Sequence, residues 1–297
     1  MSQPWLEELA DKPVPVKLGV YSMGAWSVSK LKTLERCPLQ FYLKYVAKIS
    51  CQDGEDPDKN LNRNVGIALH CILENMSLGY TIEQAKALGR HSHLDLVTEE
   101  RWHVVEEHYP TLLRFFNRIY ELSQRVDILS IEPELQLAID KNFKPVSFFS
   151  EEAFFRGVED FSLRTVDNRC LILDHKRGGN PSYGLKIHRA QLNTYLVLEH
   201  FGRAPVASAK AGIHFLEANA VVLTESVSKA SIENLLPNWL LGKIGKAVET
   251  VAQDGKFNHC RGSMCKYCEF EHLCAGGKRG TAGQLENLKI ATFKSFQ

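Results

Sequence analysis

The stretch LILDHKRGG, residues 171–179, decides how this chain folds. Three aliphatic residues lead into Asp174, one residue separates it from Lys176, and an arginine and two glycines follow. Because side chains alternate between the two faces of a strand, Asp174 and Lys176 point to the same face. The pattern therefore predicts a buried strand that ends with an acid and a lysine side by side.

A β-hairpin is expected to bring a second carboxylate to this pair. Residues 150–166 alternate as a strand does, and the turn dipeptide Asp167-Asn168 separates them from the strand that carries Asp174. An antiparallel pair closed at that turn places Asp160 beside Asp174. Two carboxylates that converge in this way suit a hard divalent cation such as Mg²⁺ or Mn²⁺, and the nearby lysine suits developing negative charge on a phosphate.

The order of the predicted elements indicates a mixed α/β protein. Helical spacing dominates up to about residue 125, with one helix expected over about 98–125 and an interruption expected at Pro38, and short alternating segments begin at about residue 129. A helix over 187–201, strands over 206–218 and 220–225, and a helix over 228–252 that Pro237 should divide or kink complete the pattern. We divide the chain into a lead-in (1–25), a helical N-terminal region (26–128), a core with a sheet (129–256), a Cys-rich segment (257–277) and a tail (278–297).

Composition excludes several classes of protein. The formal net charge is +1, so any surface that attracts nucleic acid must be local. No apolar run approaches the roughly 20 residues that span a bilayer, and the start of the chain has no apolar signal-peptide core. We therefore expect a cytoplasmic protein that does not contact a membrane. The 8 cysteines are then more typical of metal binding than of disulfides.

Two further pairs of residues have helical spacing. His70 follows Gly66 by four residues, and Tyr195 follows Gln191 by four. Each pair by itself is common on structural grounds. Together with the hairpin, the segments GIALH, GVED, DHK and QLNTY resemble the motifs of the PD-(D/E)xK nuclease superfamily, and of its RecB-type exonuclease branch in particular.

This resemblance spans about residues 26–275 and implies a fold and an activity. The expected fold is a restriction-endonuclease-like core, in which helices flank a central mixed sheet. The expected activity is hydrolysis of single-stranded or end-opened DNA by a metal-dependent exonuclease. The resemblance implies that the metal ligands are His70, Asp160, Asp174 and the carbonyl of His175, that Lys176 is the catalytic lysine, and that Gln191 and Tyr195 support the site or contact the DNA backbone.

Two glutamates near these motifs have open roles. Glu159 stands where the family usually has an apolar residue, so its side chain either points away from the site, or is a spare acid, or marks a shifted strand register. Glu134 lies in the preceding strand and is a weaker candidate ligand. A solvent-facing strand glutamate is the more common role for such a residue.

The cysteine-rich segment CRGSMCKYCEFEHLC, residues 260–274, leaves two ligand sets open. A structural zinc would use Cys260, Cys265, Cys268 and Cys274. A [4Fe–4S] cluster would use Cys37 with Cys265, Cys268 and Cys274. The chain resembles AddB-like nuclease domains and CRISPR-associated adaptation exonucleases in this arrangement, so we favour the cluster, which would link the first helix to the C-terminal segment.

The biological setting has several readings. A nuclease of this kind serves recombination and repair, phage DNA metabolism or CRISPR adaptation, and its partners beside DNA would be a helicase or CRISPR adaptation proteins. The alternative is a non-catalytic subunit that binds DNA ends or has a structural role in a larger complex. The complete acid–acid–lysine set favours the nuclease, because a decayed site would be expected to lack one member.

Overall fold

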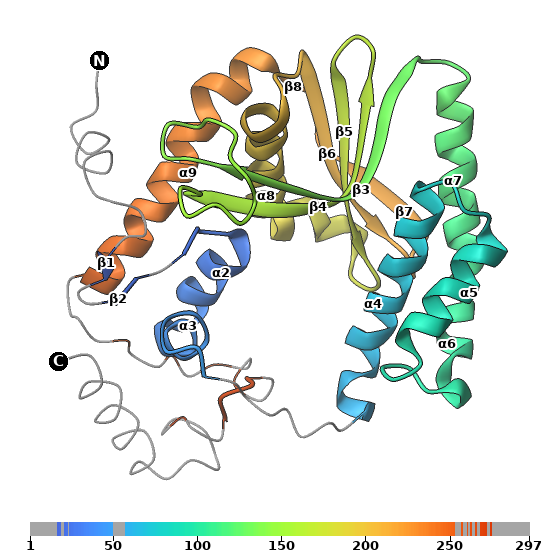
Figure 1. Ribbon diagram of the computed structural model, residues 1–297, viewed down its shortest axis with the longest axis horizontal. Helices are drawn as coiled ribbons and strands as arrows, with labels where there is room; N and C mark the ends of the chain where they lie inside the picture. The colour runs from blue at the N-terminus through green and yellow to red at the C-terminus, as the bar shows by residue number, and fades with distance from the viewer. Residues whose placement is uncertain are drawn as a thin grey trace.

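The computed structural model describes residues 17–18, 21–22, 24–49 and 57–252, together with 257, 260, 262, 265, 268–271 and 274. Its centre is a six-stranded mixed sheet with the strand order β3-β4-β5-β6-β7, in which β8 also pairs with β6 (Figure 1). Helices cover both faces of this sheet, which confirms the predicted α/β class. The strands are β3 (Ile128–Ile139), β4 (Phe155–Thr165), β5 (Arg169–Lys176), β6 (Ser208–Phe215), β7 (Ala220–Leu223) and β8 (Val227–Ser228), and a separate pair is formed by β1 (Lys17–Leu18) and β2 (Tyr21–Ser22).

The helices differ from the sequence prediction in two places. The segment expected to be one helix over 98–125 is divided, and its longest part begins with Pro110 in its first turn. The last helix runs through Pro237 without a break in its assignment, although the sequence predicted a division or a kink there. The helices are α2 (Val28–Arg36), α3 (Pro38–Phe41), η1 (Tyr42–Val46), α4 (Pro57–Ser77), α5 (Ile82–His93), η2 (Glu99–Arg101), α6 (His103–Glu106), α7 (Tyr109–Ser123), α8 (Pro181–Val197), η3 (Leu198–Arg203) and α9 (Lys229–Ala252).

The predicted hairpin of β4 and β5 is present. Asn168 has a φ of 61°, the left-handed conformation that tight turns need. The strands pair from Arg164 with Cys170 to Phe161 with Leu173. Extended by one residue, this register puts Asp160 opposite Asp174. The hairpin therefore sets the two carboxylates side by side.

After β5, a short loop leads into α8, and the chain then returns to β6, which runs parallel to β5. Gly179 lies in this turn with a φ of 124°, and a Cβ there would stand 2.9 Å from Cε1 of Phe215. Only glycine adopts this conformation without strain. One of the two glycines of the opening stretch is therefore explained by the exit from the strand, which directs α8 across the end of β5.

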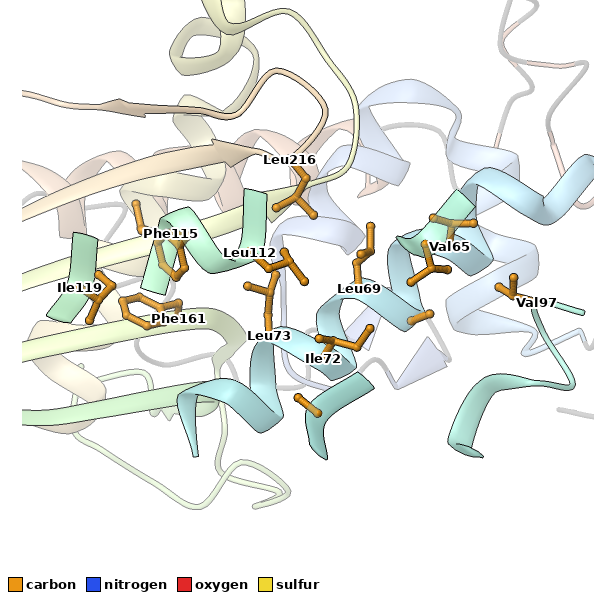
Figure 2. Packing of buried hydrophobic residues seen from close by; sticks show 14 of the residues in the cluster. Val65, Leu69, Ile72, Leu73, Val97, Leu112, Phe115, Ile119, Phe161 and Leu216 are labelled. Carbon is orange, nitrogen blue, oxygen red and sulfur yellow. The ribbon is translucent and has the colours of Figure 1, made fainter. Parts of the chain in front are cut away.

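One face of the sheet is covered by α4 and α7, and α5 and α6 pack against α4. Figure 2 shows buried residues of the core that they share. Leu69 and Leu73 of α4 are buried at helical spacing, and Phe115 of α7 packs edge-on against Phe161 of β4 at a ring distance of 5.3 Å. Burial of each such side chain contributes about 1.5–3 kcal/mol. This packing holds α4 against the sheet, and His70 follows directly after Leu69 on that helix.

The other face is covered by α8 and α9, with α2 packed against both of these helices. Trp26, Phe41 and Val197 belong to one buried cluster on this side. In the described part of the chain, no helix combines the length and the apolarity that crossing a bilayer requires. The division of the chain into five segments stays a prediction. Cys51 and the tail 278–297 lie outside the described residues.

Candidate active site

Asp174 and Lys176 meet at the end of β5, as the alternation predicted. Lys176 Nζ lies 2.7 Å from Asp174 Oδ2. Asp174 is 1% exposed, and although Oδ2 is in ion-pair contact with the lysine, it accepts no hydrogen bond of good geometry from any described residue. A buried carboxylate oxygen in this state has capacity left for a cation, because burial without full pairing raises its free energy.

The second oxygen of Asp174 is held by α8. Gln191 Nε2 donates to Asp174 Oδ1 over 2.6 Å, and the Tyr195 hydroxyl donates to the same oxygen over 3.3 Å. Gln191 Nε2 also lies 2.8 Å from the tyrosine oxygen. Burial, and then the charge of Asp174, raise the pKa of Tyr195 well above its ordinary value, so the tyrosine is a neutral donor. Both residues of the QLNTY segment thus orient the carboxylate.

His70 reaches the same place from α4. Its Nε2 lies 3.0 Å from the carbonyl oxygen of His175, and its Nδ1 lies 3.6 Å from Glu134 Oε1 and 3.7 Å from Asp160 Oδ2. Burial acts to lower the pKa of His70, but the charges of Glu134 and Asp160 outweigh it and raise the pKa above the ordinary value. The imidazole therefore sits among oxygen groups that attract positive charge.

Glu134, which the sequence made only a weaker candidate ligand, lies close to His70. It lies in β3 between the pairs Pro133 with Phe161 and Leu135 with Glu159, which puts it opposite Asp160. Its φ of 45° interrupts the regular strand and its side chain is half-buried. The only signal in the sequence was an acid in a strand next to a proline, which is too common to select it.

Asp160 completes the group from β4. Its Oδ2 accepts a 2.7 Å hydrogen bond from the backbone N–H of His175. Burial, and then the neighbouring charge of Asp174, raise the pKa of Asp160 to about 7. A divalent cation relieves the repulsion between such carboxylates, and its binding displaces a proton from the carboxyl group.

The donor set fits such a cation. One ligand atom each from His70, Glu134 and Asp160 lie within 4.8 Å of one another. Asp174 is not one of these three residues, but it lies opposite Asp160 in the hairpin, and its Oδ2 keeps capacity for the same cation. Carboxylate oxygens with one imidazole suit Mg²⁺ or Mn²⁺. The residues present could hold the metal that the resemblance implies, with Glu134 added to the expected ligands.

The carbonyl of His175 accepts from His70, while its side chain is buried between Phe115 of α7 and His214 of β6. His175 Nδ1 lies 3.0 Å from Nδ1 of His214, and the ring of Phe115 stacks on that of His214 with centroids 4.6 Å apart. Burial, and then the neighbouring His214, lower the pKa of His175 well below its ordinary value. The side chain is thus a neutral core group, and only the backbone of His175 is available at the site.

A hollow of about 750 Å³ opens beside the group. It is bounded by α4, by Glu134 and by the end of β5, and His70, Lys176 and Arg177 line it. This volume lies in the range of ligand sites in proteins. Cys71 is half-buried and lines this hollow, whereas Cys170 is buried away from it.

Glu159 is buried toward η3 and not toward the candidate ligands. It is 0% exposed, and Glu199 and Arg203 of η3 are among its charged neighbours. Neither of its carboxylate oxygens has a hydrogen-bond partner among the described residues. Burial, and then the charge of Glu199, raise the pKa of Glu159 well above its ordinary value. The regular pairing of Glu159 with Leu135 excludes a shifted register at this point.

Cys37, at the end of the first helix, lies near two cysteines of the C-terminal segment. Cys37, Cys268 and Cys274 pack against the same buried cluster around Phe270. Lys44 Nζ and Glu269 Oε1 form an ion pair of 2.8 Å beside them. Among the described residues, no three cysteine sulfurs lie within 4.8 Å of one another.

Cys265 makes contacts with its own segment. Its Sγ accepts a hydrogen bond from the N–H of Gly262 over 3.4 Å and lies 3.6 Å from the carbonyl oxygen of Cys260. Cys260 itself is exposed. Cys265, which belongs to both expected ligand sets, is therefore close to Cys260.

Comparison with known proteins places the chain in a family. The profile of the PD-(D/E)XK nuclease superfamily matches residues 25–275. Comparison with curated proteins found no match. One solved structure, described as the crystal structure of SSO0001, aligns over 91% of each chain with 12% sequence identity and a TM-score of 0.36, a likeness too low to carry an argument. The profile covers the hairpin, the histidine of α4 and the cysteine-rich segment, and the chain therefore belongs to the PD-(D/E)XK nuclease superfamily.

Proposed function

We propose that this protein is a metal-dependent DNA exonuclease of the RecB-type branch, acting on single-stranded or end-opened DNA. The observation that carries the proposal is the convergence of His70, Asp160 and Glu134 next to the ion pair of Asp174 and Lys176. A hollow of about 750 Å³ beside them gives a strand access. Superfamily membership supports hydrolysis of a phosphodiester bond in general, and the motif order supports the branch.

Each residue has a role that follows from its contacts. When bound, a divalent cation supplies polarisation of a phosphoryl oxygen and activation of water. His70, Glu134, Asp160, Asp174 and the carbonyl of His175 would hold that cation. Their geometry is fixed before substrate arrives, because the His175 N–H already binds Asp160 over 2.7 Å.

Lys176 and the residues of α8 act on the other side of the site. The Lys176 ammonium is one-third exposed while its partner Asp174 is buried, so the lysine can turn to the phosphate while the carboxylate stays in place. There it stabilises the negative charge that develops on the phosphoryl oxygens. Gln191 and Tyr195 hold Asp174 in the orientation that a metal ligand needs.

The biological setting of the proposed nuclease is also part of this proposal. We place the activity in recombination and repair, phage DNA metabolism or CRISPR adaptation, with a helicase or CRISPR adaptation proteins as partners. The support is the order of the motifs in the sequence together with the cysteine spacing. Reconstitution with the products of neighbouring genes, scored as a change in the rate of DNA digestion, would separate these settings.

The test of the activity uses end-labelled single- and double-stranded DNA with Mg²⁺ or Mn²⁺. Wild-type protein is expected to shorten strands from an end, and Lys176→Ala and Asp174→Asn are expected to lower the rate by about 10²-fold or more. Lys210→Ala removes an exposed lysine of β6 and serves as the matched control. Activity that survives both site variants would defeat the site assignment, and binding of DNA ends without cleavage would favour a non-catalytic subunit.

We also propose that Cys37, Cys265, Cys268 and Cys274 hold a [4Fe–4S] cluster. The support is that Cys37, Cys268 and Cys274 pack on one buried cluster although they are far apart in the sequence. A brown sample with visible absorption that is lost in Cys37→Ser is the expected result. Stoichiometric zinc without colour, lost in Cys260→Ser but retained in Cys37→Ser, would establish the zinc site on Cys260, Cys265, Cys268 and Cys274 instead.

A further inference from the structure

A second hollow, of about 350 Å³, borders the candidate active site. Its walls come from α2, from β4, from α8 and from the loop that precedes β4, which contributes Phe148. Gln191 and Tyr195 belong to its wall as well as to the group around Asp174. These two side chains therefore link the hollow to Asp174.

The charged side chains in the wall of this hollow are Lys32 and Arg156, and no carboxylate is among its described lining residues. Lys30 adds a third cation nearby, with its Nζ donating to the carbonyl oxygen of Ala25 over 2.6 Å. Burial, and then the charge of Arg156, lower the pKa of Lys30 to about 8. Cations gathered in this way repel one another, and an anion in the hollow would relieve that repulsion.

The wall also has the donors that a phosphate requires. Arg156 is anchored by a 3.2 Å hydrogen bond from its Nη1 to the carbonyl oxygen of Phe148, and its guanidinium lies 5.1 Å from the centre of the Phe148 ring. A guanidinium held at one nitrogen presents its remaining N–H groups as a planar fork, which matches phosphate oxygens. The exposed hydroxyl of Ser29 lies in the same wall.

Lys32 connects the hollow to the catalytic group. Its Nζ donates to Gln191 Oε1 over 3.3 Å, and the amide nitrogen of the same glutamine donates to Asp174. An anion bound by Lys32 would thus be one side chain away from the carboxylate at which a phosphate is proposed to be cut. In a nucleic acid strand, the anion next to the phosphate that is cut is a neighbouring phosphate of the same strand.

We propose that this hollow binds a phosphate group of the nucleic acid strand next to the one that is cut, through Arg156, Lys32 and Ser29. The inference rests on the proposed nuclease function. An internal phosphodiester and a terminal phosphate share the recognising chemistry, and the experiment below separates them.

The experiment measures oligonucleotide binding in an Asp174→Asn background, so that no strand is cut. Affinity for a single-stranded oligonucleotide is followed between about 50 and 200 mM salt. Arg156→Gln is expected to weaken binding about tenfold and to lower the slope of log K against log salt by roughly 0.7, the value for one phosphate contact on a single strand. Arg156→Lys keeps the charge and is expected to restore the slope.

Two further variants guard against trivial explanations. Arg125→Gln removes an exposed arginine after α7 and is the matched control, expected to bind as the background does. Ser29→Asp places a negative charge in the first turn of α2, where a carboxylate stabilises the helix, so weaker binding by this variant cannot be ascribed to unfolding. Unchanged affinity and slope in both Arg156→Gln and Ser29→Asp would overturn the inference.

Three oligonucleotides of one sequence separate the two sources of phosphate. They carry a 5′-phosphate, a 3′-phosphate or hydroxyl groups at both ends. An equal loss of affinity in Arg156→Gln for all three supports an internal phosphodiester, and a loss confined to one phosphorylated end supports a terminal phosphate. If wild-type protein cuts DNA and Arg156→Gln binds normally, the inference alone fails; if wild-type protein neither binds nor cuts DNA, the proposed function fails with it.

Discussion

Gln191 Nε2 donates a 2.6 Å hydrogen bond to Asp174 Oδ1, and this contact ties helix α8 to the end of strand β5. The two residues come from elements that follow one another in the chain, and the glycine-rich turn between them sets their approach. Because the Tyr195 hydroxyl reaches the same oxygen, one carboxylate oxygen of Asp174 is committed to α8 and the other faces Lys176.

The hydrogen bond from Gln191 predicts a loss of function without loss of a direct ligand. We expect Gln191→Ala to lower Mn²⁺ affinity or the rate of DNA cleavage about 10- to 100-fold, because residues that orient metal ligands have effects of this size. Titration calorimetry with Mn²⁺ and the labelled-DNA assay measure the two quantities. Gln124→Ala, at the exposed end of α7, is the matched control, and wild-type values for Gln191→Ala would contradict the role.

Glu134 is predicted to be a metal ligand. The conservative change Glu134→Gln keeps the shape of the side chain but removes its charge, and we expect it to weaken Mn²⁺ binding by about tenfold or more. Glu152→Gln, in the exposed loop before β4, removes the same charge away from the site. If Asp160→Asn abolishes Mn²⁺ binding while Glu134→Gln leaves it at the wild-type level, Glu134 is not a ligand.

The buried pair of His175 and His214 predicts a pH-dependent stability. Burial, and then the charge of Arg118, lower the pKa of His214 to about 4. The unfolded chain therefore binds a proton that the folded chain does not between about pH 6.5 and 4, and stability falls as pH falls through this window, by roughly 3 kcal/mol at most for this group. Above that window the group has no effect.

Urea unfolding at several pH values measures this contribution. His214→Gln retains a polar neighbour for His175 and is expected to flatten the decline of the free energy of unfolding between pH 6.5 and 4. Parallel pH profiles for the wild type and His214→Gln would show that His214 takes up its proton without penalty in the folded protein.

Leu69 is predicted to hold α4 on the sheet. It is fully buried, directly before His70. Leu69→Ala should lower the free energy of unfolding by about 2–5 kcal/mol, the range for truncating a buried leucine. Leu78, just after α4, is 61% exposed, and Leu78→Ala should change stability by no more than about 0.5 kcal/mol. Similar losses in chemical denaturation for the two variants would refute the assignment of Leu69 to the core.

Local features of the sequence predicted the hairpin well, for a physical reason. Asp167-Asn168 located the turn, and the short connection of residues 166–168 leaves little freedom in register, so Asp160 comes to lie opposite Asp174. The division at Pro38 and the start of α7 at Pro110 are likewise local. The proline at position 110 was a readable signal that the prediction of one helix over 98–125 overlooked.

Other features depended on parts of the chain that no local rule connects. β3 and β4 are joined by residues 140–154, too long a connection to set a register, so the position of Glu134 opposite Asp160 could not be read from the sequence. Glu159 is buried next to charges that η3 brings to it, among them Glu199, which a strand pattern does not reveal.

The sequence by itself indicated the superfamily through the resemblance of its motifs. It also determined the α/β class and the convergence of Asp160, Asp174 and Lys176, because short-range turn chemistry and strand alternation carry that information. Only the tertiary structure decided which other groups join them. His70 reaches the site because Leu69 and its neighbours pack α4 on the sheet, and Arg156 and Lys32 share a hollow because α2 lies against α8. Burial of apolar surface, which is not directional, sets those placements, and the charged residues follow.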